Sequence, residues 1–151
     1  MNIGIIGFGV DGQAVNAGFR DKCTIMVNDK KFPQGRDKQK CYLGSKGWIA
    51  ETKEYTPWNY TLEYIVIECE FIFICIPVPY NNDTGRQETE EIGSLIKEID
   101  NLSNKKGNRS IVIIKSAISP RDAIEIDAEL VNTELIVSPE YLTERTSIHD
   151  F

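Results

Sequence analysis

The sequence predicts a doubly wound α/β domain, in which helices cover both faces of a mostly parallel sheet. Short apolar runs alternate along the chain with segments of helical periodicity, which is typical of βαβ units. These runs are apolar at consecutive positions, as expected for strands that are covered on both faces. The chain has 151 residues, so we expect a single domain over residues 1–151.

The first half of the chain predicts one βαβ unit followed by a loop. Apolar and β-branched runs predict strands at Ile3–Ile6 and Thr24–Asn28. The segment Gln13–Arg20 between them has small residues on one face and predicts a helix. The polar stretch Lys30–Tyr60 contains several glycines and prolines, and we expect it to be mostly loop with short elements.

The second half continues the alternation of helices and strands. Apolar residues with the spacing i, i+3, i+4, i+7 predict helices over Leu62–Cys69 and Ile92–Ile99. A further helix is expected from Pro120 to Leu130, because proline is favoured in a first helical turn. Strands are predicted at the apolar runs Phe71–Ile76, Ile111–Ile114 and Leu135–Val137.

Composition and charge exclude several classes of function. Hydrophobic residues make up 41% of the chain and charged residues 26%, as in ordinary globular proteins. A net charge of −6 argues against binding to nucleic acid or to anionic membranes. The longest apolar stretch contains glutamates and does not predict a membrane span. One histidine and four cysteines without a CxxC pair predict no metal site. We therefore expect a cytoplasmic protein with reduced thiols.

A glycine-rich loop, Gly7-Phe8-Gly9-Val10-Asp11-Gly12, joins the first predicted strand to the first predicted helix. In this position the GxGxxG pattern is the fingerprint of a Rossmann-type dinucleotide site. Gly7 permits the tight turn, Gly9 lets the backbone approach a pyrophosphate, and Gly12 allows close helix–strand packing. The alternative is a glycine turn that only packs a helix on a strand.

Two carboxylates near this loop, those of Asp29 and Asp11, affect which dinucleotide it can bind. Asp29 closes the second strand, where it would accept hydrogen bonds from ribose hydroxyls and favour NAD over NADP. Lys30 and Lys31 leave NADP open as an alternative. Asp11 places a negative charge where a phosphate should arrive, which is unfavourable unless it points to solvent and caps the helix.

Three later segments of the chain contain motifs of their own. They are Pro77-Val78-Pro79, Lys115-Ser116-Ala117 and Ser138-Pro139-Glu140-Tyr141-Leu142-Thr143-Glu144. In order and spacing, these segments and the glycine loop resemble the N-terminal domain of the UDP-glucose/GDP-mannose dehydrogenase family. That family has a P-T-P-like turn, a K-S-T strand end and an S/N-P-E-F-L-x-E motif. The resemblance covers the whole chain, and the last segment is its most specific part.

The resemblance implies NAD as cofactor and the two-step oxidation of a sugar-nucleotide alcohol to a carboxylate. It places at the cofactor the residues Gly7, Gly9, Val10, Asp11, Gly12, Asp29, Pro77, Val78, Ser116, Ala117 and Glu144. Glu140 matches a glutamate that assists the chemistry around a covalent thioester, and Glu144 matches one near the nicotinamide. The alternative for both glutamates is a solvated helix start after Pro139.

The chain also departs from the family pattern. Val78 and Ala117 stand where the family has threonine, so a hydroxyl expected beside the cofactor is missing. The family's nucleophilic cysteine lies beyond the matching region, and none of the four cysteines matches its motif: Cys23, Cys41, Cys69 and Cys75. Because the covalent step requires a thiolate, we expect the isolated chain to be inactive.

Three functions therefore remain open. The first is the NAD-binding domain of an enzyme resembling UDP-glucose 6-dehydrogenase. The second is a stand-alone nucleotide-binding module without catalysis, and the third is a degenerate interaction protein. The expected partners are a dinucleotide, a sugar nucleotide, and either a second copy of the chain or a C-terminal domain.

Overall fold

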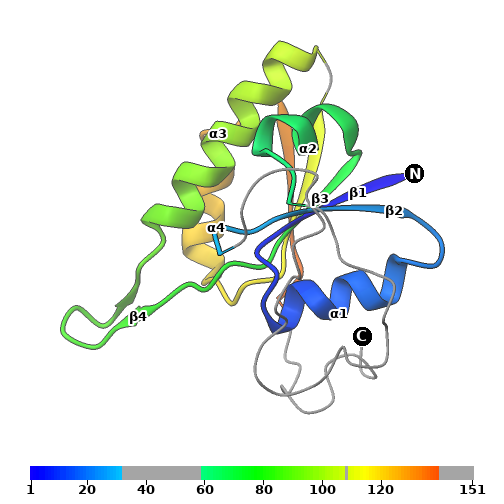
Figure 1. The fold of residues 1–151 in the computed structure, drawn as a ribbon. Coiled ribbons are helices and arrows are strands. Elements are labelled where there is room, and N and C mark those ends of the chain that lie inside the picture. The colour runs from blue at the N-terminus through cyan, green and yellow to red at the C-terminus, as the bar shows by residue number, and fades with distance from the viewer. Residues whose placement is uncertain (32–58, 108, 140–151) are drawn as a thin grey trace.

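The computed structural model describes residues 1–31, 59–107 and 109–139 (Figure 1). Five parallel strands form one sheet in the order β2-β1-β3-β6-β7. Their bounds are β1 Asn2–Ile6, β2 Thr24–Asn28, β3 Phe71–Ile74, β6 Ser110–Ile114 and β7 Thr133–Val137. The predicted fold class is confirmed.

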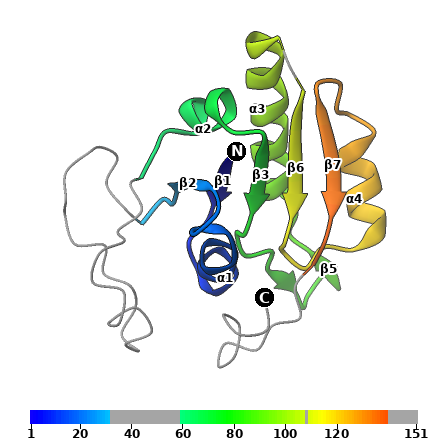
Figure 2. The same cartoon turned by 90° about the vertical axis from the view of Figure 1, so that its right-hand side faces the viewer.

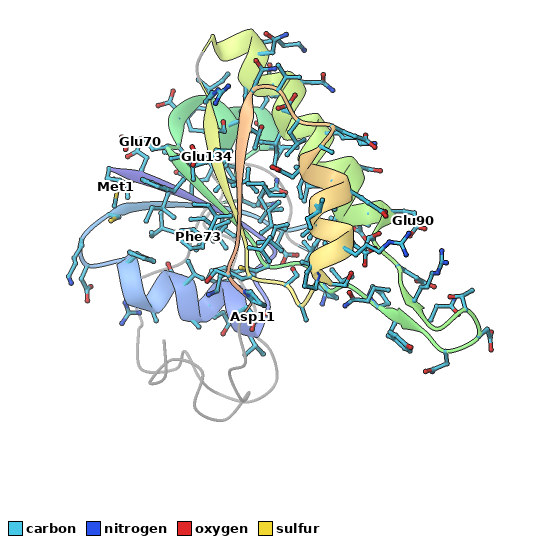
Figure 3. All side chains as sticks on the ribbon, turned by 180° about the vertical axis from the view of Figure 1, so that it is seen from behind. Met1, Asp11, Glu70, Phe73, Glu90 and Glu134 are labelled. Atoms are coloured by element: carbon cyan, nitrogen blue, oxygen red, sulfur yellow. The ribbon has the colours of Figure 1, made fainter. Side chains whose placement is uncertain are left out.

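Helices cover both faces of this sheet (Figure 2). One face carries α1 (Val10–Phe19), and the other carries α2 (Leu62–Glu68), α3 (Glu90–Lys106) and α4 (Pro120–Asp127). The buried apolar residues form two clusters, one on each face of the sheet. The larger cluster joins the strands to the three helices through residues such as Ile65, Ile96 and Ile126, and the smaller one joins them to α1 through Val15. In Figure 3, Phe73, which belongs to the smaller cluster, lies at the centre of the sheet.

Local sequence explains where the helices begin and end. The Thr61 hydroxyl accepts a hydrogen bond from the Tyr64 N–H and caps α2. Ser119 caps α4 in the same way, one residue before Pro120. Gly107 ends α3 with a φ of 71°, a left-handed conformation that glycine adopts at low cost.

The connections diverge between β1 and β3. From β1 the chain passes through α1 to β2 on one side, and it later returns to β3 on the other side. Beyond β2, Asn59 forms a parallel bridge with Val27, and the Tyr60 N–H donates to the Val27 carbonyl at 2.7 Å. Ligands of open α/β sheets bind at such a switch point, outside the carboxyl ends of the strands.

Several predicted boundaries were wrong by a few residues. Helix α1 begins at Val10 rather than Gln13, because the glycine loop leads into it with Gly9 as N-cap. Helix α4 ends at Asp127 rather than Leu130, since the chain tightens there into turns with i to i+3 hydrogen bonds. Strand β3 ends at Ile74, two residues before the predicted end.

A hairpin that the sequence pattern did not predict lies between β3 and α3. It consists of β4 (Tyr80–Asn81) and β5 (Arg86–Gln87), and it projects from the body of the domain (Figure 1). The Asn81 side chain accepts hydrogen bonds from two backbone N–H groups of the turn, at 3.0 Å each. Most of the predicted loop Lys30–Tyr60 lies outside the described residues.

Candidate functional site

A cavity of about 320 Å³ opens at the switch point, beside the carboxyl ends of β1, β2 and β3. Six of the predicted site residues line it, namely Gly7, Gly9, Val10, Asp11, Asp29 and Pro77. The fold therefore brings the glycine loop, the end of β2 and the end of β3 around one space.

The fold itself requires glycine at two positions of the loop. Gly7 has a φ of 87°, and a Cβ there would lie 2.6 Å from the Cys75 carbonyl oxygen. A Cβ on Gly12 would lie 2.1 Å from the Gly7 carbonyl oxygen. Both glycines are explained by the close approach of α1, β1 and β3, with or without a ligand.

Gly9 differs from these two glycines. Its φ of −73° suits any residue, and apart from its chain neighbours no atom of the described residues lies within 4 Å of where its Cβ would be. The described part of the fold therefore has room for a larger residue, and the helix itself favours glycine only as one of several suitable N-cap residues. Gly9 itself lines the cavity, and a glycine at this place in a Rossmann-type loop lets the backbone approach a pyrophosphate.

The first turn of α1 faces the same cavity. Gly9 is the N-cap, so no side chain at that position covers the free N–H groups of the first turn. Asp11 lies in the first turn and lines the cavity, half-buried, rather than occupying the N-cap (Figure 3). The site thus combines an anion-binding helix terminus with a carboxylate at the same place.

Asp29 links the end of β2 to the glycine loop. Its Oδ2 accepts a hydrogen bond of 2.7 Å from the Phe8 N–H, and its Oδ1 accepts one of 2.7 Å from the Lys31 N–H. The Asn59 amide holds the Asp29 backbone, accepting from its N–H at 2.8 Å and donating to its carbonyl at 3.2 Å. A carboxylate has about four acceptor positions, so ribose hydroxyls can still bind to it.

The second predicted segment lies behind the cavity wall. Ser116 is 4% exposed, and its hydroxyl donates to the Ile76 carbonyl oxygen at 2.5 Å. It thus ties the end of β6 to the segment after β3 and does not line the cavity. Val78, Ala117 and Gly12 do not line it either.

The hairpin holds the loop after β6 in place. The Gln87 amide donates to the Ala117 carbonyl oxygen at 2.8 Å, and its oxygen accepts from the Ser119 N–H at 2.7 Å. At the start of the same loop, buried Lys115 lies 3.4 Å from the Ser138 hydroxyl at the end of β7. The described part of the third segment therefore meets the second one, whereas Glu140 and Glu144 lie outside the described residues.

Sequence reasoning missed several residues that line the cavity. Among them are Glu91 and Leu95, from the first turns of α3. Lys30, which the sequence offered as a cation for NADP, lines the cavity from the end of β2. The Lys30 ammonium pairs with the Glu91 carboxylate across the cavity. Only the tertiary fold brings these two distant residues together, so no local pattern could have indicated the pair.

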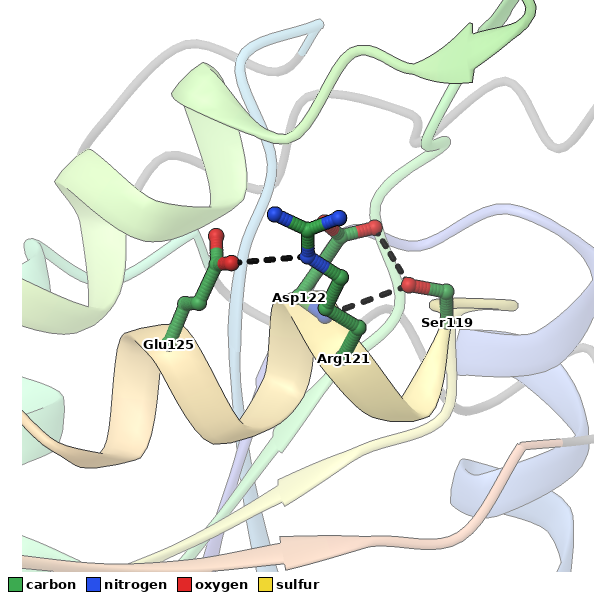
Figure 4. A network of polar contacts seen from close by, with 4 residues as sticks. All are labelled: Ser119, Arg121, Asp122 and Glu125. Atoms are coloured by element: carbon green, nitrogen blue, oxygen red, sulfur yellow. Dashed lines mark hydrogen bonds and ion pairs between the residues drawn. The ribbon is translucent and has the colours of Figure 1, made fainter.

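A second cavity, of about 530 Å³, lies between the hairpin and α4. Four of its polar residues, all in α4 or just before it, pair with one another (Figure 4). Ser119 exchanges hydrogen bonds with Asp122, and Arg121 pairs with Glu125 at 2.9 Å. The hydrogen bond to Glu125 raises the pKa of the Arg121 guanidinium.

Two further features are missing from the described part of the chain. None of its helices combines the length and the apolar character of a membrane span. Its histidine, cysteine and acidic residues form no cluster of three that could hold a metal ion.

Comparisons with known proteins agree with this geometry. The family model described as "UDP-glucose/GDP-mannose dehydrogenase family, NAD binding domain" matches residues 1–151. No curated protein matches the chain.

Solved structures show the same fold. The chain is similar to a UDP-glucose dehydrogenase from Pyrobaculum islandicum, with a TM-score of 0.74 and 18% identity. It is also similar to a GDP-mannose dehydrogenase from Pseudomonas aeruginosa, with a TM-score of 0.70 and 19% identity. In both comparisons 99% of this chain covers 38% of the other chain. The chain thus spans well under half the length of these relatives.

Proposed function

Because this chain belongs to the UDP-glucose/GDP-mannose dehydrogenase family, whose NAD-binding domain it matches, we propose that the cavity at the switch point binds NAD for the oxidation of a sugar nucleotide. The proposal rests mainly on Gly9. The described fold has room for a larger residue there, and Gly9 lines the cavity. When bound, NAD accepts the hydride that the substrate alcohol gives up.

Each part of the cavity has a role in this proposal. The backbone at Gly9 and the first turn of α1 bind the pyrophosphate. Asp29 accepts hydrogen bonds from the adenosine ribose, and its bonds to Phe8 and Lys31 hold it in place for that contact. Ser116 positions the segment around Ile76 and Pro77, which forms the wall after β3.

Residues 1–151 supply the cofactor half of the proposed site and a partial catalytic half. Glu140 and Glu144 are proposed to act on the substrate side and beside the nicotinamide. Cys69 and Cys75 are buried in the apolar clusters, and the sequence of residues 1–151 leads us to infer that no cysteine there is the nucleophile. A thiol in an apolar environment is a poor nucleophile, so we do not expect these residues alone to oxidise the sugar nucleotide.

A second candidate function is a nucleotide-binding module without catalysis. Val78 and Ala117 favour it, because they stand where the family has threonine, so a hydroxyl expected beside the cofactor is missing. The glycine loop and Asp29, which are proposed to bind the dinucleotide, are retained.

Thermal unfolding with added ligands tests both candidates. A ligand that binds only the native state raises the melting temperature, so NAD and NADH should each raise it. The absence of a shift at millimolar NAD would remove both candidates. NAD with UDP-glucose or GDP-mannose should yield no NADH from residues 1–151, and sustained turnover would contradict the assignment of a partial site.

A further inference from the structure

An exposed ion pair lies at the part of the cavity that is proposed to bind the adenosine ribose. Lys30 follows Asp29 directly at the end of β2, and Glu91 lies in the first turn of α3. Both side chains are largely exposed, at 84% and 58%, and both residues line the cavity. Exposed pairs of this kind contribute little to stability, so the contact has little to do with holding the fold together.

The position of Lys30 matters for the choice of cofactor. NADP differs from NAD by a phosphate on the adenosine ribose, and a cation beside the ribose-binding acid accommodates that phosphate. Lys30 and Lys31 stand next to Asp29 and could supply such a cation. In this structure the Lys30 ammonium is instead paired with Glu91.

We propose that Glu91 is a specificity-determining residue that disfavours NADP by occupying Lys30 and adding a second carboxylate beside Asp29. The inference rests on the proposed function of the cavity. Among the described residues, the charged ones that line the cavity are three acids, Asp11, Asp29 and Glu91, and two lysines, Lys30 and Lys31. Without Glu91, these residues would carry two negative and two positive charges, and the Lys30 ammonium could pair with a phosphate.

Calorimetric titration of NAD and NADP into wild type and the Glu91→Gln variant tests the inference. The preference for NAD, expressed as the ratio of the two dissociation constants, should fall by about three- to tenfold in Glu91→Gln. Most of the change should appear as tighter NADP binding. Adding Lys30→Gln to the variant should restore most of the original preference.

Glu90→Gln is the matched control. Glu90 is the neighbouring acid in the same first turn of α3, but it lines the second cavity and lies towards the hairpin (Figure 3). Its substitution makes the same change in net charge, and the NAD preference should stay within about twofold of wild type.

The outcomes separate this inference from the function on which it rests. If wild type binds NAD and the preference is unchanged in Glu91→Gln, or shifts equally in Glu90→Gln, the role of Glu91 is refuted while the proposed function stands. If wild type binds neither dinucleotide, the proposed function is refuted and the role of Glu91 with it.

Discussion

The Asp29 carboxylate accepts a hydrogen bond of 2.7 Å from the backbone N–H of Phe8, which lies inside the glycine loop. The bond joins the end of β2 to the turn after β1 and so fixes two walls of the cavity relative to each other. Asp29 thus has a structural role in addition to its proposed contact with the ribose.

Removal of this carboxylate should therefore destabilise the protein even without cofactor. Asp29→Ala leaves the N–H groups of Phe8 and Lys31 without their acceptor. We expect the free energy of unfolding in urea to fall by about 1–3 kcal/mol. Asp83→Ala in the exposed hairpin turn is the control, with a change within about 0.5 kcal/mol. Equal unfolding midpoints for Asp29→Ala and wild type would contradict the structural role.

Asp11→Asn should strengthen NAD binding. The substitution keeps the shape of the side chain and removes the negative charge that shares the cavity with the pyrophosphate. The dissociation constant from calorimetric titration should fall by about three- to tenfold at low salt, and by less at high salt. The control is Asp21→Asn, which removes a charge after the far end of α1. Unchanged affinity in Asp11→Asn would place the carboxylate away from the phosphates.

Gln87→Ala should loosen the loop after β6. Both hydrogen bonds from the Gln87 side chain to this loop are lost, those with Ala117 and Ser119. We expect a loss of roughly 1–2 kcal/mol in the free energy of unfolding and faster hydrogen exchange at the Ser119 amide. Asn82→Ala, at the exposed hairpin tip, should change neither. Unaltered exchange at Ser119 in Gln87→Ala would show that the loop is held by other contacts.

Gly12→Ala should damage the fold, because the new Cβ would lie 2.1 Å from the Gly7 carbonyl oxygen. A backbone atom cannot move aside as a flexible side chain can, so we expect a loss of at least about 2 kcal/mol in urea unfolding. The control is Gly93→Ala, also in a helix, where the Cβ meets Ile126 at an ordinary 3.9 Å. That variant should be as stable as wild type or slightly more stable.

The sheet could be predicted because its signals are local. Strand β2 matches its predicted bounds, and the glycine loop has the predicted strand before it and the predicted helix after it. The β4–β5 hairpin could not be predicted in the same way, since strands of two residues are too short to show periodicity. Its turn depends on Asn81 and on Gly85 with a φ of 66°, a weaker signal than an apolar run.

The candidate site was predictable where a motif marks it. Gly7, Gly9 and Asp29 line the cavity, whereas Gly12 does not, and Ser116 bonds to the wall segment after β3. Glu91 could not be foreseen, because a glutamate in a first helical turn is ordinary and only the crossover brings it to Lys30.

Gly9 is proposed to let the backbone approach a bound dinucleotide. Gly9→Ala tests this claim most directly, because the described fold has room for the extra methyl group and the backbone conformation suits alanine. Without ligand, the melting temperature of Gly9→Ala should stay close to that of wild type or fall slightly, because alanine is less favoured than glycine at an N-cap. With millimolar NAD, wild type should melt at a higher temperature and Gly9→Ala should show little or no shift. An NAD-induced shift in Gly9→Ala as large as that of wild type would contradict the claim.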